Sequence, residues 1–165
     1  MEINLTETYL LDYNHSSIIE VIEKNKWHLL PIKEAIQAVY GYVQNTIIFG
    51  YNSDDYIKAS KVLKDGYGQC NTKSILLMAF LRRLKIPCRM HGFIVEKNFQ
   101  KGCLKGLYYK FSPNEIIHGW VEVYYNQTWY VLEGVILDKK YVNQLQDKYK
   151  SNNSEFHRYA ISTNN

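Results

Sequence analysis

Seven consecutive apolar residues, Ile-Leu-Leu-Met-Ala-Phe-Leu, occupy positions 75–81 near the middle of the chain. The run is too long for a typical strand, and its residues are mostly good helix formers. As a helix it is apolar around most of its circumference. A helix of this kind is stable only when other elements cover it on all sides. The sequence therefore predicts a buried central helix over residues 70–84, which ends before Ile86 and Pro87.

Three shorter helices are expected before the central one. Each has apolar residues at helical spacing, and together they cover residues 16–26, 31–45 and 56–65. Ser16 or Ser17 can serve as the N-cap of the first helix, and Pro31 fits the first turn of the second. The third helix follows a polar turn at 51–55 and ends before Gly66, because glycine is common directly after a helix.

Strand patterns follow the central helix, in segments 88–95, 116–125 and 127–132. The last two segments predict a hairpin that turns near Asn126. Alternation along its first strand separates two sets of residues, with His118, Trp120, Glu122 and Tyr124 on one face and Gly119, Val121, Val123 and Tyr125 on the other. Helices followed by a meander of antiparallel strands define the α+β class.

Two segments are less regular. Residues 96–114 are long enough to form an active-site flap or an added hairpin between the first two strands. From Asp138 onward, Tyr141, Leu145 and Tyr149 recur at helical spacing. We therefore expect residues 139–165 to form a C-terminal helix and tail, which either docks on the core or covers the cleft.

Length and composition exclude several classes of protein. The 165 residues fit one domain, and 46% hydrophobic against 22% charged residues indicates a globular chain. The net charge of +4 is scattered, so no nucleic-acid partner is expected, although a pI of 8.8 keeps that hypothesis as the third in rank. An acidic N-terminus and the lack of an apolar run of roughly 20 residues predict a cytoplasmic protein with no membrane segment.

The three cysteines are odd in number and form no CxxC pair, so neither a disulfide framework, a metal site nor a cofactor is predicted. Cys88 falls in a predicted strand and Cys103 in a loop, and both are expected to be structural or incidental. Cys70 instead begins the central helix, whose free N–H groups and dipole favour a thiolate. Gly66 and Gly68 add flexible backbone before it, so the N–H of Cys70 could face a substrate oxyanion.

A cysteine nucleophile needs a base that is held in place by an acid. His118 lies eight residues before Asn126 and Glu133 lies seven residues after it. The two side chains are therefore expected within one residue of cross-strand register, where the carboxylate can accept a hydrogen bond from the imidazole. His91 is the alternative base, because it also lies in a predicted strand.

Three segments in this order resemble the transglutaminase-like superfamily over about residues 32–138. They are Gly68-Gln69-Cys70 before the buried helix, Leu-Arg-Arg-Leu-Lys-Ile-Pro-Cys-Arg at 81–89, and His-Gly-Trp-Val-Glu-Val at 118–123 followed by Trp-Tyr-Val-Leu-Glu at 129–133. The resemblance is to small stand-alone domains of bacterial type. It implies a papain-like cysteine-enzyme core, with the nucleophile at the start of a buried helix packed on an antiparallel sheet.

The resemblance also implies roles for individual residues. Cys70 would be the nucleophile, His118 the general base and acid, and Glu133 the orienting acid. The family usually carries Asp where this chain has Glu133, so Asp138 is the alternative acid. Gln69, beside the nucleophile, is a candidate for oxyanion stabilisation through its side-chain amide.

The expected function is therefore acyl transfer from amide bonds of a peptide or protein substrate through a Cys70 thioester. With water as acceptor the protein is a peptidase, amidase or deamidase, which its small size favours; with an amine it is a protein-glutamine transglutaminase. Cross-linking members carry Trp where this chain has Asn71, which weakens that second assignment. A non-catalytic peptide-binding module on the same fold is the alternative from a different class.

Overall fold

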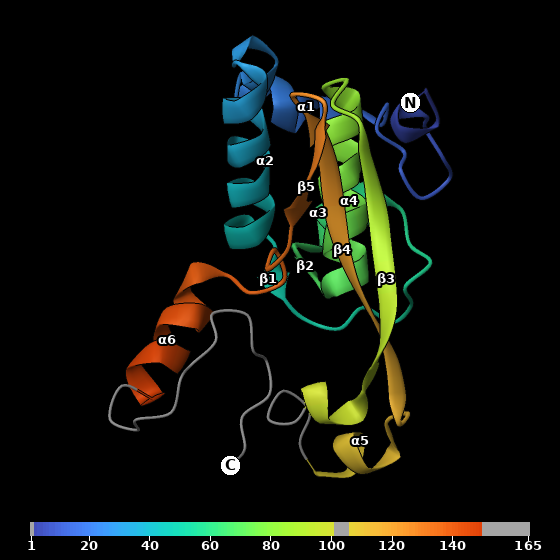
Figure 1. Cartoon of the computed structure of the whole chain (residues 1–165), viewed down its shortest axis with the longest axis vertical. Helices are drawn as coiled ribbons and strands as arrows, with labels where there is room; N and C mark the ends of the chain where they lie inside the picture. The colour runs from blue at the N-terminus through green and yellow to red at the C-terminus, as the bar shows by residue number, and fades with distance from the viewer. Residues whose placement is uncertain (1, 101–105, 150–165) are drawn as a thin grey trace. The chain divides into compact units, whose positions relative to one another are not determined.

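The computed structural model describes residues 2–100 and 106–149 of the chain (Figure 1). Packing divides the chain into two compact units. The first unit comprises Met1–His91 and Gly119–Lys139, and the second comprises Gly92–His118 and Lys140–Asn165. The predicted nucleophile and both candidate acids belong to the first unit, whereas His118 ends the first segment of the second unit.

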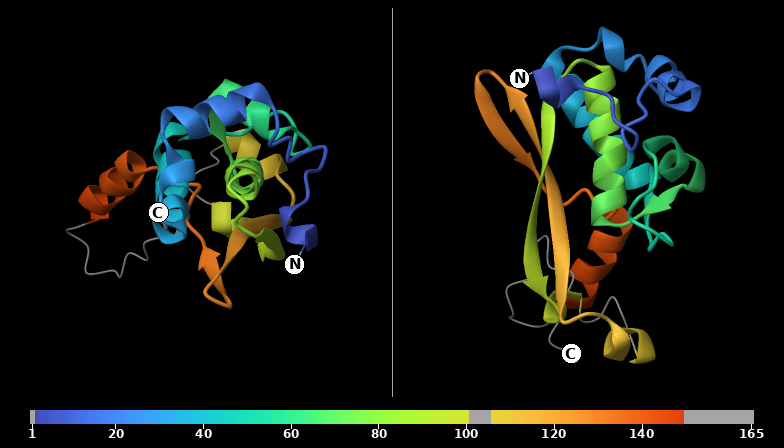
Figure 2. Two further views of the ribbon diagram at one scale, coloured as in Figure 1. Left: turned by 90° about the horizontal axis from the view of Figure 1, so that it is seen from above. Right: turned by 90° about the vertical axis from the view of Figure 1, so that its right-hand side faces the viewer.

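Helix α4 (Cys70–Arg83) is the centre of the first unit, which confirms the predicted buried central helix (Figure 2, left). Helices α1 (Ser16–Lys24), α2 (Ile32–Thr46) and α3 (Ala59–Asp65) pack against it. Leu76, Leu77, Phe80 and Leu81 of α4 have no exposed surface. An all-round apolar helix is stable here because helices cover one side and the sheet covers the other.

The helix ends show which local signals were decisive. His15, rather than Ser16 or Ser17, caps α1, because its Nδ1 accepts a hydrogen bond from the Ser17 N–H. Pro31 directly precedes α2, as its position in the sequence predicts. Gly66 ends α3 with a φ of 72°, a left-handed conformation that suits glycine. Short 3-10 turns cover Glu2–Leu5 and Trp27–Leu29.

Two short strands lead the chain into α4. Strand β1 (Ile48–Phe49) follows α2, and β2 (Tyr67–Gly68) ends two residues before Cys70, the predicted nucleophile. They pair in parallel, with Ile48 opposite Tyr67. The sequence pattern did not predict them, since two residues are too few to show an alternation. The pairing holds residues 67–68, which lead the chain to Cys70, beside the end of α2.

A three-stranded sheet has the order β3 (Cys88–Glu96), β4 (Glu115–Tyr125), β5 (Thr128–Leu132). Strands β4 and β5 are antiparallel and join through Asn126 and Gln127, whose φ values of 46° and 62° identify a type I′ turn. Val121 and Val123 are buried in the core, whereas Trp120 and Glu122 are only partly buried. The predicted alternation is therefore confirmed over this part of β4.

The register of the hairpin differs from the predicted one by one residue. Val121 pairs with Leu132 and Tyr125 with Thr128, so the turn is centred between positions 126 and 127. A ladder continued past Leu132 would set Glu133 opposite Trp120, two positions from His118 in register rather than one. Glu133 itself lies directly after the end of β5.

The second unit contains the segment that was expected to form a flap or an added hairpin. Its described residues instead form a 3-10 turn (Lys97–Gln100) and helix α5 (Gly106–Phe111). Lys97 organises this segment, since its N–H donates to the Asn114 carbonyl and its Nζ donates to the carbonyls of Lys110 and Ser112.

The predicted C-terminal helix is confirmed as α6 (Lys139–Tyr149). It begins at the last residue of the first unit, where the Lys139 N–H donates to Asn45 Oδ1 at 3.2 Å. The predicted tail, from residue 150 onward, lies outside the described residues, as does Cys103.

Candidate active site

Cys70 is the first residue of α4, as predicted, and its side chain is partly buried. The chain reaches it through Gly68, where a Cβ would lie 2.7 Å from Thr72 Oγ1 and 3.0 Å from Lys73 Cγ. A side chain at position 68 would therefore collide with the first turn of the helix. Glycine allows the backbone to pass close to that turn and present the thiol at its N-terminus.

Asp55, from the loop before α3, organises the polar groups around the thiol. Its carboxylate accepts hydrogen bonds from Gln69 Nε2 and from Asn71 Nδ2, the latter at 3.2 Å. Because a carboxylate only accepts, the amide nitrogen of Asn71 must face Asp55 and its oxygen must face the other way. That oxygen accepts from Cys70 Sγ at 3.6 Å.

Gln69, the oxyanion candidate, is held at both ends of its side-chain amide. Its Oε1 accepts from the Asn52 N–H at 2.8 Å, while its Nε2 donates to Asp55. Thr72 completes the arrangement, because its hydroxyl accepts from the Gln69 N–H and donates to Asn52 Oδ1. The Gln69 amide is thus fixed in direction, with one of its two hydrogens engaged by Asp55.

The environment of Cys70 contains opposing effects on its ionisation. Burial is the main cause that raises the pKa of the thiol above its ordinary value, and the charge of Asp55 acts in the same direction. Backbone N–H groups of Gly119, Asn71 and Cys70 itself act against them. The net direction is upward, so at neutral pH the resting thiol keeps its proton and a base has to remove it for attack.

The predicted base is next to the residue that contacts the thiol. Gly119 lies so close to the start of α4 that a Cβ on it would be 3.1 Å from Asn71 Oδ1, and its backbone hydrogen-bonds Cys70. His118 directly precedes Gly119 in β4. Its imidazole is buried and packs edge-to-face on Phe93, with 5.5 Å between ring centroids.

The two candidate acids have different surroundings in the first unit. The side chain of Glu133 is exposed, and its backbone carbonyl accepts a hydrogen bond from the Tyr40 hydroxyl at 2.7 Å. Asp138 is partly buried, and its charge acts on the ammonium group of Lys73. The structure therefore gives Asp138 an electrostatic partner on α4.

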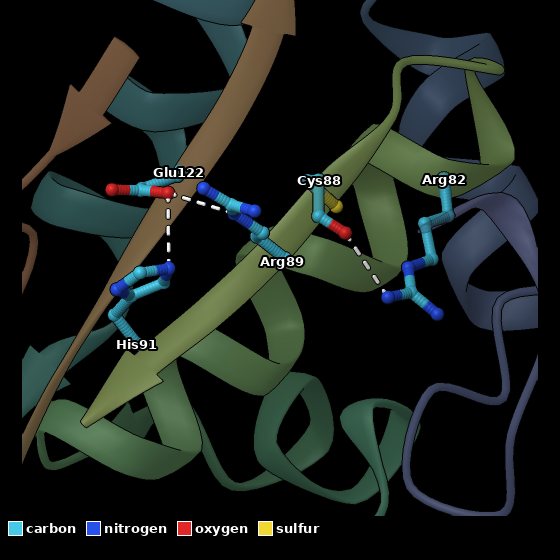
Figure 3. A network of polar contacts seen from close by, with 5 residues as sticks. All are labelled: Arg82, Cys88, Arg89, His91 and Glu122. Carbon is cyan, nitrogen blue, oxygen red and sulfur yellow. Dashed lines mark hydrogen bonds and ion pairs between the residues drawn. The ribbon is translucent and has the colours of Figure 1, made fainter. Parts of the chain in front are cut away.

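His91, the alternative base, belongs to a different polar network (Figure 3). Its Nε2 lies 3.1 Å from Glu122 Oε2, which also accepts from Arg89 Nε at 2.8 Å. The Arg89 guanidinium in turn covers the Trp129 ring at 4.1 Å. His91 and Arg89 occupy the opposite face of β3 from Met90, whose side chain would meet a Cβ on Gly119.

Cys88 has the surroundings of a structural cysteine. It is fully buried, and its Sγ donates to the Met78 carbonyl of α4. Burial raises the pKa of its thiol to about 11. Arg82 binds the Cys88 carbonyl through Nη2 at 3.0 Å (Figure 3). Its Nη1 binds the Thr6 carbonyl, so Arg82 ties both β3 and the N-terminal segment to α4. A neutral, enclosed thiol of this kind is inert.

Within the described part of the chain, no group of three or more His, Cys, Asp or Glu side chains is arranged to hold a metal ion. None of the described helices is long and apolar enough to cross a lipid bilayer.

Comparison with known proteins gives two similarities. The sequence model of the transglutaminase-like superfamily matches residues 21–134, which include Cys70, His118 and Glu133. Among solved structures, a proposed cysteine protease from Cytophaga hutchinsonii aligns with a TM-score of 0.60 and 15% sequence identity. The alignment covers 79% of this chain but only 40% of that protein, and at this identity it shows a shared fold. No curated protein matches the chain.

Proposed function

Because the chain belongs to the transglutaminase-like superfamily, a superfamily of cysteine enzymes, we propose that its Cys70 thiol attacks amide bonds of peptides or proteins. The observation that carries this proposal is the position of Cys70. It is the first residue of a buried helix, and its thiol is hydrogen-bonded by the backbone of Gly119, the residue after His118. The proposal takes from this arrangement a sulfur nucleophile, helix N–H groups for an oxyanion, and a histidine next in sequence to Gly119.

The reaction then has two steps. His118 takes the proton of Cys70 as sulfur bonds to the amide carbonyl carbon, and returns it to the departing amine as the C–N bond breaks. The acyl group is left on sulfur as a thioester. His118 next takes a proton from water, whose oxygen bonds to the acyl carbon, and the thiolate leaves and regains that proton. Glu133 orients the imidazole throughout, as the third group of such triads does.

The raised pKa of the Cys70 thiol supports general-base catalysis over a permanent ion pair. In a permanent ion pair the sulfur is already a thiolate beside an imidazolium. A thiol that keeps its proton at rest is not in that state, so a base has to remove the proton during attack.

An amine acceptor is the second candidate, and one observation favours it. The carboxylate of Asp55 lies beside the nucleophile and acts electrostatically on the thiol. A carboxylate in that place attracts protonated amines to the entrance of the site. Under this alternative the thioester transfers its acyl group to an amine and the protein is a transglutaminase.

One screen tests both candidates. Peptide, glutamine-containing and glycoprotein substrates are incubated with and without a primary amine, and release of ammonia or peptide and incorporation of amine are measured. We expect turnover in the wild type and in the control Cys103→Ser, and its loss in Cys70→Ala with the fold retained. Equal turnover in Cys70→Ala would refute the proposal, and binding of a peptide by both proteins without turnover would favour a non-catalytic binding module.

A further inference from the structure

Lys73 lies one turn into α4, three residues after Cys70, and no part of its side chain is exposed. Lysine is rarely buried, because an ammonium group that loses water must be compensated by hydrogen bonds or an opposite charge. The triad chemistry gives Lys73 no role. Its position and its partners therefore require a separate explanation.

Three backbone carbonyls surround the Lys73 ammonium group. Nζ donates to the oxygens of Gln44 at 3.2 Å, Ile47 at 2.6 Å and Ile136 at 3.1 Å. An ammonium group has three hydrogens to donate, whereas a neutral amine has two and a lone pair. Three acceptors match the charged form and leave one carbonyl unsatisfied in the neutral form.

These carbonyls come from two segments of the first unit. Gln44 and Ile47 lie at the end of α2, where a helix leaves its last carbonyls without partners. Ile136 lies three residues after Glu133, in a buried stretch beyond β5. Lys73 therefore joins the chain that follows the candidate acid to the helix that begins with the candidate nucleophile.

The rest of this stretch is also fastened through its backbone. Gln44 Nε2 donates to the Gly134 carbonyl at 3.3 Å, and the Tyr40 hydroxyl donates to the Glu133 carbonyl. Both donors lie on α2. Lys73 supplies the positive charge in this set of contacts and is the donor that comes from α4, so it couples the placement of Glu133 to the helix of Cys70.

The charge of Lys73 is sensitive to pH. Burial lowers the pKa of its ammonium group to about 7, and the carboxylate of Asp138 opposes that shift. Two titratable groups are nearest to Lys73 along the elements that surround it. They are Asp138, on the segment after Ile136, and Cys70, one turn earlier on α4. The end of α2 presents carbonyl oxygens to Lys73.

We propose that Lys73 is a positioning residue for the reaction, which in its charged form fastens the chain behind Glu133 to the start of α4. When it loses its proton, one of its three carbonyl bonds is lost and Glu133 is no longer held for His118. This inference rests on the proposed function, because it assigns Lys73 an effect that acts through the triad acid.

A double-mutant cycle tests the coupling without a known substrate. Iodoacetamide alkylation of Cys70 is measured at pH 6.5 by peptide mass mapping in Lys73→Met, Glu133→Gln and the double variant. Each single change is expected to slow alkylation by roughly threefold to tenfold, and the double variant to be no slower than the slower single one. Lys64→Met, which removes an exposed lysine on α3, is the matched control and should leave the rate unchanged.

A second measurement covers the case in which Lys73→Met does not fold, which circular dichroism would reveal. The alkylation rate of the chain that keeps Glu133, divided by the rate of the same chain with Glu133→Gln, cancels the ionisation of the thiol itself. In the wild-type background this ratio is expected to fall towards one as the pH rises from 6 to 8.5. In an Asp138→Asn background, where the opposing carboxylate is gone, the fall should occur at lower pH.

The outcomes separate the two proposals. The role of Lys73 would be overturned if the two losses of alkylation rate multiply in the double variant, or if the rate ratio does not change with pH. Either result would still leave the reactivity of Cys70 dependent on Glu133. If Glu133→Gln has no effect in any background and Cys70 reacts no faster than an ordinary thiol, the proposed function itself fails.

Discussion

The ionisation of the Cys70 thiol depends on groups that come from three parts of the chain. The helix start supplies N–H groups, β4 supplies the backbone of Gly119, and the loop before α3 supplies Asp55. The first two favour the thiolate, and Asp55 opposes it both by its charge and by turning the Asn71 oxygen towards the sulfur. Asp55 therefore adds to the effect of burial, which is the main reason that the pKa of the Cys70 thiol is raised.

Replacement of Asp55 by Asn tests this effect. Loss of the negative charge should lower the pKa of the Cys70 thiol and increase its alkylation rate near neutral pH by roughly twofold to tenfold. The pH dependence of iodoacetamide labelling measures that pKa. Asp54→Asn is the matched control, because Asp54 bonds the Tyr56 N–H instead. An unchanged or higher thiol pKa in Asp55→Asn would contradict the assignment.

Sequence reasoning placed Cys70, the predicted nucleophile, at the start of the central helix but missed two residues around it. Cys70 could be predicted because the helix start, the glycines and the downstream motifs are all visible in the chain. Asp55 lies 15 residues earlier in a polar turn, and only tertiary folding brings it to the thiol. Lys73 resembles a solvent-exposed residue of a polar first helical turn, because its carbonyl partners at 44, 47 and 136 are distant in sequence.

At the scale of elements, the close passage of β2 into α4 determines how the Cys70 thiol is presented. Gly68 pairs with Phe49 in the parallel β1–β2 ladder and lies against Thr72 and Lys73. The Thr72 hydroxyl, which accepts from the Gln69 N–H, and the buried Lys73 side chain both depend on the absence of a side chain at position 68.

The change Gly68→Ala should therefore be costly. The new methyl group would push on Thr72 and Lys73, and we expect the free energy of unfolding to fall by about 1 to 3 kcal/mol. Gly41→Ala is the control, since position 41 lies within α2 with open space around its Cβ, and there alanine should stabilise by about 0.5 to 1 kcal/mol. Urea unfolding measures both. Equal effects of the two changes would argue against a tight passage at Gly68.

Most elements were predictable, because hydrophobic period and punctuation are local. The exceptions have physical causes. His15 replaced the expected serine caps because a ring nitrogen can also accept from a helix N–H. The segment after β3 forms helical turns around the Lys97 side chain rather than strands. The hairpin register shifted because its turn uses two residues with positive φ, Asn126 and Gln127, instead of one central residue.

For the whole molecule, the buried lysine makes stability depend on pH. An unfolded lysine keeps its proton up to about 10.5, whereas folded Lys73 loses it at about 7. Between these values the unfolded chain binds one more proton than the folded chain, so this group makes stability rise with pH. Cys70 and Cys88 act in the opposite direction, because their folded pKa values are raised; the Cys88 value changes from 9.0 to about 11.

The free energy of unfolding is therefore expected to increase between pH 7 and about 9, by at most about 1.4 kcal/mol per pH unit. Lys73→Met should remove that increase, because the group that titrates is gone. Urea titrations of the two proteins at pH 7, 8 and 9 measure the difference in slope. The same slope in both would mean that Lys73 does not change its charge in this range.

The most direct test of the central claim is the rate of Cys70 alkylation as a function of pH, with and without His118. The raised pKa of the Cys70 thiol alone would make its alkylation slow near neutral pH, whereas an adjacent base would make the alkylation fast. We predict that wild-type Cys70 is labelled about tenfold or more faster than Cys88, and that His118→Ala slows the labelling of Cys70 by a similar factor while His91→Ala does not. Slow, equal labelling of Cys70, Cys88 and Cys103, or an unchanged rate in His118→Ala, would contradict the account.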